Sequence, residues 1–317
     1  MRTAIFRRVT TFETQLQALT PLRASIGPAA DAYLACTPTG TSRRGRSLQV
    51  LRSAGRDLEL VLEVSHPGGL PLVQPLPGGT FLIAVPRSPR RPDGSVTPNA
   101  WVYGATGNLI DTWLLGDGLE DMQCTAAGDV WTTYTATGTM GDYGRFGWGR
   151  LGPEVWIEPI GGPGLMRFDA QGEASYSYRP PTGMPIIMDC YALNVASNRV
   201  WATYHPGFAL LGVDYKERSD WWASDLGPQD ALAIDGDLVL GYAAFRSKRY
   251  ASLGRLAGSA LRKVDNLEVR LSDGAPATSI EWMVGRGSTL HAFSRTAWYS
   301  LDLATIRLSS GQRGSGT

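Results

Sequence analysis

Short runs of hydrophobic and β-branched residues alternate along this chain with polar turns that contain glycine. Two segments show the pattern clearly, 101–113 and 165–178, and each consists of two apolar runs joined by a tight turn. Runs of this length, bounded by glycine-containing turns, are typical of β-hairpins. The sequence therefore predicts paired antiparallel strands and no helix longer than about two turns.

These hairpins recur with a period of roughly fifty residues, which is the range of propellers and other repeat folds. The outer hairpins are predicted to begin near Gln49, Trp101, Leu165, Leu210, Ser252 and Trp298. The inner hairpins between them are predicted at 70–85, 122–134, 190–204, 231–245 and 280–293, with a less clear one around 24–36. Because units made only of strands close into a ring, the sequence predicts an all-β fold, a six-bladed β-propeller with four-stranded antiparallel blades.

The predicted units define one domain over residues 22–309, preceded by an N-terminal segment at 1–21 and followed by a flexible tail at 310–317. An open ring of blades would leave exposed strand edges, so one end of the chain is expected to supply a closing strand. Both 4–16 and 305–309 are candidates, and the sequence does not choose between them.

The strand order predicts that the long loops share one face of the ring. The opposite face holds tight turns such as 126–128 and 170–172. An insertion at 136–164, rich in glycine and aromatic residues, belongs to the long-loop face. Long ordered loops often carry function, so this insertion is expected either to cover the channel mouth or to pack on a neighbouring blade.

Acidic residues stand at the start of the predicted inner strands, namely Asp121, Asp189, Asp230 and Glu281. Because inner strands line the channel, these carboxylates are expected to ring its mouth, where they would raise one another's pKa or hold calcium, magnesium or manganese. The alternative is that each caps backbone N–H groups of its own loop. His205 is predicted in a loop of the same face and, with Asp189, forms the candidate catalytic pair.

Arginine is frequent in the predicted loops of this face, and guanidinium groups suit carboxylate and phosphate ligands. The candidate ligand-binding residues are Arg43, Arg90, Arg91, Tyr143, Trp148, Arg246 and Arg249. Such a rim would attract an anion or an acidic protein. The alternative is that these arginines are simply solvated.

Composition narrows the function classes. The net charge of +1 makes nucleic acid an unlikely partner, and no apolar run has the length of a signal peptide or a membrane span. Three cysteines, Cys36, Cys124 and Cys190, lack metal-binding spacing and predict reduced, buried thiols. A cytoplasmic monomer is therefore expected. Phosphate-binding, zinc-binding and Gly-x-Ser-x-Gly motifs are absent from the sequence.

Several local patterns are shared with known propellers. They are an aromatic-Val-Tyr strand at 101–103, turns of the Ala-x-Gly type and a Gly-Asp-Val-Trp hairpin at 128–131. Over residues 22–309 the chain resembles six-bladed propellers of the NHL and gluconolactonase-like kind. That resemblance implies lactone hydrolysis with a divalent cation held at the channel mouth by carboxylate and asparagine side chains. The analogous positions are Asp121, Asp189, Asn194, Asp230 and Glu281.

Two functions follow as hypotheses. The first is a ligand-binding propeller with a small-molecule site at the channel mouth, acting as a cation-assisted hydrolase or lyase. The second is a non-catalytic platform that binds an acidic protein or another anion through the arginine-rich rim. A purely structural accessory domain is the third reading.

Overall fold

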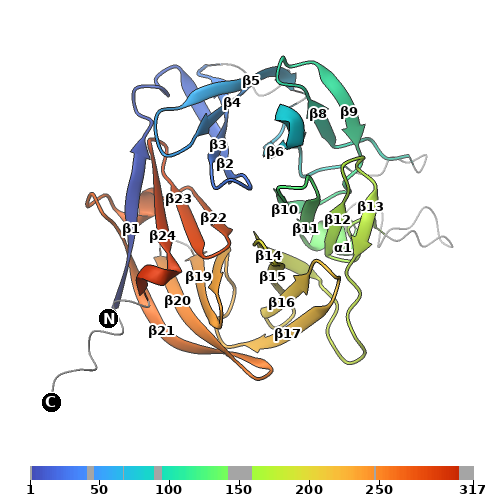
Figure 1. The fold of residues 1–317 in the computed structure, drawn as a ribbon, viewed down its shortest axis with the longest axis vertical. Coiled ribbons are helices and arrows are strands. Elements are labelled where there is room, and N and C mark those ends of the chain that lie inside the picture. The colour runs from blue at the N-terminus through green and yellow to red at the C-terminus, as the bar shows by residue number, and fades with distance from the viewer. Residues whose placement is uncertain are drawn as a thin grey trace.

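The computed structural model describes residues 2–40, 46–66, 68–88, 95–141, 159–245 and 248–306. Within these residues the chain is built almost entirely of β-strands, and the sheets are arranged radially around a central axis (Figure 1). The helical elements of this part are a short α1 (Ala136–Met140), two 3-10 turns, η1 (Pro77–Gly79) and η2 (Ala277–Ser279), and helical residues at 303–306. None of its helices is long and apolar enough to cross a membrane.

The strands pair in antiparallel groups of four, and in all but the last of these groups the strands are consecutive in the chain. Three groups are separate sheets: β2 (Leu19–Ile26), β3 (Ala32–Pro38), β4 (Arg46–Ser53) and β5 (Glu59–His66); β6 (Leu72–Leu76), β7 (Thr80–Ala84), β8 (Ala100–Tyr103) and β9 (Leu109–Trp113); β10 (Leu119–Cys124), β11 (Val130–Tyr134), β12 (Leu165–Phe168) and β13 (Ala174–Ser177). Sheets of this kind, set around one axis, make the fold an all-β propeller.

The remaining strands are joined into one larger sheet. Their antiparallel groups are β14 (Asp189–Val195), β15 (Arg199–His205), β16 (Ala209–Asp214) and β17 (Ser219–Ser224); β18 (Ala231–Asp235), β19 (Leu238–Phe245), β20 (Lys248–Ala257) and β21 (Ala260–Leu271); and β22 (Trp282–Arg286), β23 (Thr289–Phe293) and β24 (Ala297–Asp302) with β1 (Arg2–Thr11). Short parallel contacts of β21 with β17 and with β1 connect these groups.

The N-terminal strand β1 joins the two ends of the chain. Its second half pairs antiparallel with β24, from Arg7 opposite Ser300 to Thr11 opposite Ala297. Its first half pairs in parallel with the end of β21. Of the two candidate closing segments, 4–16 therefore overlaps the strand that pairs with β24, and its Ala4, Phe6 and Phe12 side chains are fully buried.

Burial explains why the strands could be recognised in the sequence. All five residues of β11 are buried, because other elements cover both of its faces. The outermost strand of the same sheet, β13, has exposed and half-buried residues. Inner strands therefore carry continuous apolar runs and outer strands carry polar residues, which is the pattern from which the hairpins were predicted.

The three cysteines are buried free thiols, and Cys124 and Cys190 lie on the first strands β10 and β14, as predicted. Burial raises the pKa of Cys36 and of Cys124 to about 12. Thiolate is the reactive form, so we expect a thiol reagent at about pH 8 to leave all three unlabelled in the native protein and to label all three after denaturation. Rapid native labelling of Cys124 or Cys190 would contradict their placement.

Candidate functional site

The first strand of each group lies nearest the axis. These strands are β2, β6, β10, β14, β18 and β22, and each contacts the next around the ring. Residues at the start of these strands and residues at their end therefore lie at opposite ends of the central channel. The two ends of the channel differ in structure: buried side chains close one end, and the other end is a cavity, which is the candidate site.

Buried side-chain amides close the end at which the first strands finish. Gln123 of β10 donates from Nε2 to the carbonyl oxygens of Leu193 (3.0 Å) and Gly285 (3.1 Å), on β14 and β22. Its Oε1 accepts from the backbone N–H of Val195 at 3.0 Å. Gln123 is 1% exposed, so one side chain ties three strands together across the axis without contact with bulk water.

Asn194 extends this closure to β18. Its Nδ2 donates to the carbonyl oxygens of Leu232 (2.7 Å) and Gly287 (2.9 Å), and its Oδ1 accepts from Gly287 N–H at 2.8 Å. Arg286 donates from Nη2 to the carbonyl oxygen of Cys124 at 2.6 Å. The resemblance to gluconolactonase-like propellers implied that Asn194 is analogous to a cation ligand. Its amide is instead fully buried in this hydrogen-bond network.

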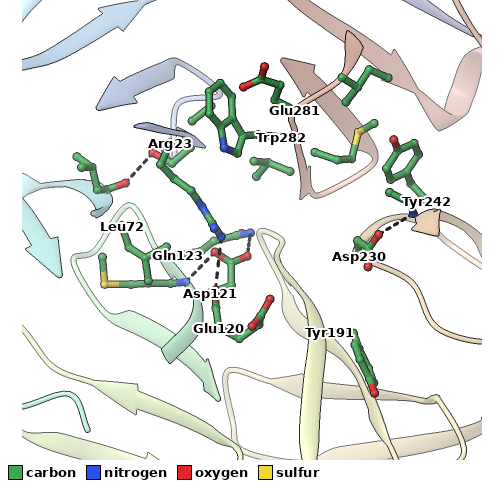
Figure 2. A pocket seen from close by; sticks show the side chains of 18 of the residues that line it. Arg23, Leu72, Glu120, Asp121, Gln123, Tyr191, Asp230, Tyr242, Glu281 and Trp282 are labelled. Carbon is green, nitrogen blue, oxygen red and sulfur yellow. Dashed lines mark hydrogen bonds between the residues drawn. The ribbon is translucent and has the colours of Figure 1, made fainter. Parts of the chain in front are cut away.

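The other end of the channel is a cavity of about 290 Å³. Figure 2 shows its lining, which comes from the starts of the first strands and from β19 and β20. Its labelled side chains are Arg23, Leu72, Glu120, Asp121, Gln123, Tyr191, Asp230, Tyr242, Glu281 and Trp282. Ligand clefts usually begin at roughly 300 Å³, so this cavity has the size for a small molecule.

Irregular pairing turns additional side chains towards this cavity. The register of β10 against β11 shifts between Leu119 and Asp121, so Glu120 is the extra residue of a bulge. The register of β14 shifts around Tyr191, and that of β2 shifts immediately before Arg23. A bulge interrupts the alternation of a strand, which explains how Glu120 and Asp121 both line the cavity although they are adjacent.

Glu120 is a carboxyl of the cavity whose pKa lies far above its ordinary value. Burial raises its pKa to about 7; Arg23 opposes the increase, and Asp121, Asp189 and Asp230 add to it. Among the described residues its carboxyl oxygens accept no hydrogen bond and form no ion pair. A carboxyl with a pKa near neutrality can hold or release a proton under physiological conditions.

Arg23 and Asp121 both line the cavity beside Glu120. Figure 2 shows the guanidinium of Arg23 directed towards the two acidic residues, and its Nη2 donates to the backbone carbonyl of Glu120 at 3.5 Å. Burial raises the pKa of Asp121, and Arg23 counteracts part of that increase. One Asp121 oxygen accepts from the N–H of Met122 at 2.8 Å, so this carboxylate is bound within its own strand.

Asp230 and Tyr242 lie across the cavity from Arg23 (Figure 2). The Asp230 carboxylate stands at the exposed rim and accepts from the N–H of Ala244 at 2.7 Å. Arg249 lines the cavity on the same side and interacts electrostatically with Asp230. Tyr242 is 2% exposed, and its hydroxyl has no hydrogen-bond partner within the described residues.

Glu281 and Asp189 have partners outside the cavity lining. Glu281 accepts from Nε of Arg295 at 2.6 Å, in a pair that is largely exposed and therefore contributes little to stability. Asp189 accepts from the N–H of Ala136 at 2.9 Å and does not line the cavity, although its neighbour Tyr191 does.

The carboxylates do not form a set of cation ligands in the part of the chain that the structure describes. No group of three or more His, Cys, Asp or Glu side chains there is close enough to hold a metal ion. Calcium requires six to eight converging oxygens, whereas each of the four predicted carboxylates accepts a hydrogen bond from its own surroundings. The described residues therefore do not fit a resident cation, and no step is derived through one.

The other predicted site residues are divided. Arg249 lines the cavity. Arg43, Arg90, Arg91, Tyr143, Trp148 and Arg246 lie outside the described residues. His205 is exposed at the end of β15, directly opposite Asp189 in the register, and is not among the cavity residues. His66 ends β5 and is buried against Trp101.

Sequence reasoning missed Arg23, Glu120, Tyr191, Tyr242 and Trp282. The acidic pair at 120–121 was visible, but the inner strand was predicted to begin after it, so only Asp121 was assigned to the mouth. Tyr242 lies in an apolar run and resembles an ordinary core residue in the sequence.

Comparison with known proteins supports the fold and does not extend to function. No family model matches the chain, and no curated protein matches it. A search of solved structures finds β-propeller proteins. One is Hsv2 from Kluyvelomyces marxianus, with a TM-score of 0.50, 7% identity, and coverage of 90% of this chain and 73% of that one.

Two enzymes are also among the similar structures. Virginiamycin B lyase from Staphylococcus aureus has a TM-score of 0.47 and 9% identity, covering 90% of this chain and 96% of that one. The PQQ-bound aldose sugar dehydrogenase from Streptomyces coelicolor has a TM-score of 0.47 and 13% identity, covering 93% and 96%. At these identities the comparison shows a shared β-propeller fold alone.

Proposed function

We propose that this propeller binds a small polar molecule in the cavity at the mouth of its channel and that Glu120 exchanges a proton with the bound molecule. The observation that carries the proposal is a carboxyl with a pKa of about 7, without a hydrogen-bond or ion-pair partner among the described residues, in a cavity of ligand size. Lyases and hydrolases commonly use proton transfer to or from such a side chain. The amides of Gln123 and Asn194 close the far end of the channel, so a ligand would enter and leave the cavity at the mouth.

The proposal includes a six-bladed ring. It is supported by the consecutive groups of four strands and by the neighbour-to-neighbour contacts of their first strands. In this arrangement residues 22–309 form the propeller, and the N-terminal segment contributes the strand that pairs with β24.

The raised pKa of Glu120 predicts how stability depends on pH. The unfolded carboxyl titrates near 4.5 and the folded one near 7, so between these values the folded state holds the extra proton. The contribution of Glu120 is full below about pH 4.5 and is lost as the pH rises through about 7. After a discount for partial exposure, we expect roughly 1–2 kcal/mol of unfolding free energy to be lost across this interval.

Denaturant unfolding at several pH values checks this expectation. Glu120→Gln, which is neutral throughout, should be more stable than the parent above about pH 7 and should have a flatter pH profile. The matched control is Glu173→Gln, an exposed turn residue away from the cavity, which should keep the parental profile. A Glu120→Gln profile that coincides with the parent's would contradict the raised pKa.

Ligand binding tests the function itself. We expect a thermal-shift screen of small sugars, amines, carboxylates and amino acids at millimolar concentration to give at least one saturable stabiliser. Its apparent Kd should change with pH around neutrality in the parent and in Glu173→Gln, but not in Glu120→Gln. The absence of any saturable stabiliser, or an unchanged pH dependence in Glu120→Gln, would overturn the proposal.

The interaction platform has less support. Most of its predicted arginines lie outside the described residues, and two described arginines of the same loops form ion pairs, Arg87 with Asp117 (2.8 Å) and Arg295 with Glu281 (2.6 Å). Binding of an acidic protein or another anion at this rim therefore stays a prediction from the sequence.

A further inference from the structure

The side chains that line the cavity include more acidic groups than basic groups. The lining contains four carboxyl groups, on Glu120, Asp121, Asp230 and Glu281, against two guanidinium groups, on Arg23 and Arg249. Arg23 lowers the pKa of Asp121, and Arg249 interacts electrostatically with Asp230. Glu281 forms an ion pair with Arg295, which lies outside the cavity lining. Glu120 and Asp121 thus share the guanidinium of Arg23, so the described part of the cavity wall carries more carboxyl groups than cations to balance them.

Tyr242 provides an independent observation. Its side chain is 2% exposed and lines the cavity, yet its hydroxyl has no hydrogen-bond partner within the described residues. A buried polar group without a partner costs free energy, so such a group at a cavity wall points to a ligand that completes it. Burial raises the pKa of the Tyr242 hydroxyl to about 12, and the Asp230 carboxylate adds to the increase.

Aromatic rings supply the remaining lining. Tyr191 and Trp282 both border the cavity, and Trp282 follows Glu281 directly in the chain. The face of an aromatic ring attracts a cation, and the attraction is strongest for tryptophan. An excess of carboxyl groups, aromatic rings and a buried hydroxyl without a partner among the described residues together are the chemistry that recognises an organic ammonium ion.

We propose that the ligand of this cavity is a small organic cation carrying an ammonium group, which lies between Glu120 on one side and Asp230 and Tyr242 on the other. The inference rests on the function proposed above and names the class of ligand. An inorganic divalent ion is a poorer fit, because the described carboxylates do not converge as ligands. An anion is also a poorer fit, because it would add to the excess of negative charge.

Proton release is a direct consequence. An ammonium group beside Glu120 favours the ionised carboxylate, so binding at about pH 6.5 should expel a proton from Glu120 to the buffer. Calorimetry in buffers of different ionisation enthalpy measures this number of protons. We expect release of up to about one proton by the parent and of none by Glu120→Gln.

A matched set of probes tests the charge preference. Butane-1,4-diamine, butane-1,4-diol and succinate share a four-carbon chain and differ in carrying ammonium, hydroxyl or carboxylate ends. With the full chain at low salt, we expect the diamine to raise Tm saturably and to bind at least about tenfold more tightly than the diol, because it gains a charge-assisted hydrogen bond. Succinate should not bind.

Two variants locate the binding. Asp230→Asn keeps the shape and can still accept from Ala244, and it should weaken diamine binding about 10- to 100-fold. Tyr242→Phe removes only the hydroxyl and should weaken diamine binding about 3- to 10-fold without loss of stability. Tyr178→Phe is the matched control, because Tyr178 is equally buried and lies outside the cavity, and it should bind the diamine as the parent does.

The outcomes separate this inference from the proposed function. Equal or tighter binding of the diol or succinate, diamine binding that survives Asp230→Asn, or no response to any of the three probes would overturn the ammonium ligand. A saturable stabiliser of another class in the broader screen, with its pH dependence lost in Glu120→Gln, would then leave the proposed function intact. Failure of that screen as well would remove both.

Discussion

Replacement of Gln123 by leucine should destabilise the protein by about 3–5 kcal/mol, because it leaves three buried backbone groups without partners. Those groups are the carbonyl oxygens of Leu193 and Gly285 and the N–H of Val195, on two strands other than that of Gln123. Leucine matches glutamine closely in size, so the loss comes from hydrogen bonds and not from a cavity. Urea unfolding monitored by tryptophan fluorescence measures the change.

Gln171→Leu is the control for this substitution. Gln171 is exposed in the turn between β12 and β13, where the same change should alter the unfolding free energy by less than about 0.5 kcal/mol. If the two variants were equally stable, the amide network would not be what closes the channel. The dead-end cavity would then lose its physical basis.

The strand pattern made the fold predictable, because burial follows position within each group. The second strand β11 is covered on both faces, and all of its residues VWTTY are buried, whereas glycine turns separate the hairpins. The closing strand was harder to identify, because β1 pairs with residues almost three hundred positions away. No local pattern encodes a partner at that distance in the chain.

The candidate site was only partly predictable, for a reason that the bulges make clear. The sequence predicted the inner strand from Met122, so only Asp121 was assigned to the mouth, and in a regular strand Glu120 and Asp121 would point to opposite faces. The register shift in β10 places both on the cavity, and a similar shift acts around Tyr191 in β14. A bulge depends on the pairing of two strands, so the sequence of one strand does not reveal it.

The chemistry of the carboxylates also depended on their neighbours. Asp121, Asp230 and Glu281 were assigned to the channel mouth from position alone, and all three line the cavity. Whether such groups hold a cation or accept hydrogen bonds from their loops is decided by distances of a few ångströms. In the described residues Asp121 and Asp230 accept from backbone N–H groups and Glu281 accepts from the Arg295 guanidinium, which no spacing in the sequence could show.

Substitution of Gly285 by alanine should have an effect of similar size, for a steric reason. Gly285 lies in β22 where that strand crosses closest to β18, and a Cβ there would overlap the carbonyl oxygen, carbonyl carbon and nitrogen of Leu232. These are backbone atoms in a paired strand, so they cannot rotate away as a side chain does. We expect a loss of about 3 kcal/mol or more in unfolding free energy, measured by urea denaturation.

Gly254→Ala separates this close approach from the general cost of changing a strand glycine. Gly254 lies in β20, and its nearest neighbours would be side-chain methyl groups of Leu261 at 2.8 Å and Leu226 at 3.2 Å, which can move. We expect a loss of about 1 kcal/mol for this variant. Equal losses for the two alanines would mean that β22 and β18 can separate freely. The channel end below the cavity would then be held by the Gln123 and Asn194 amides and not by contact between the strands.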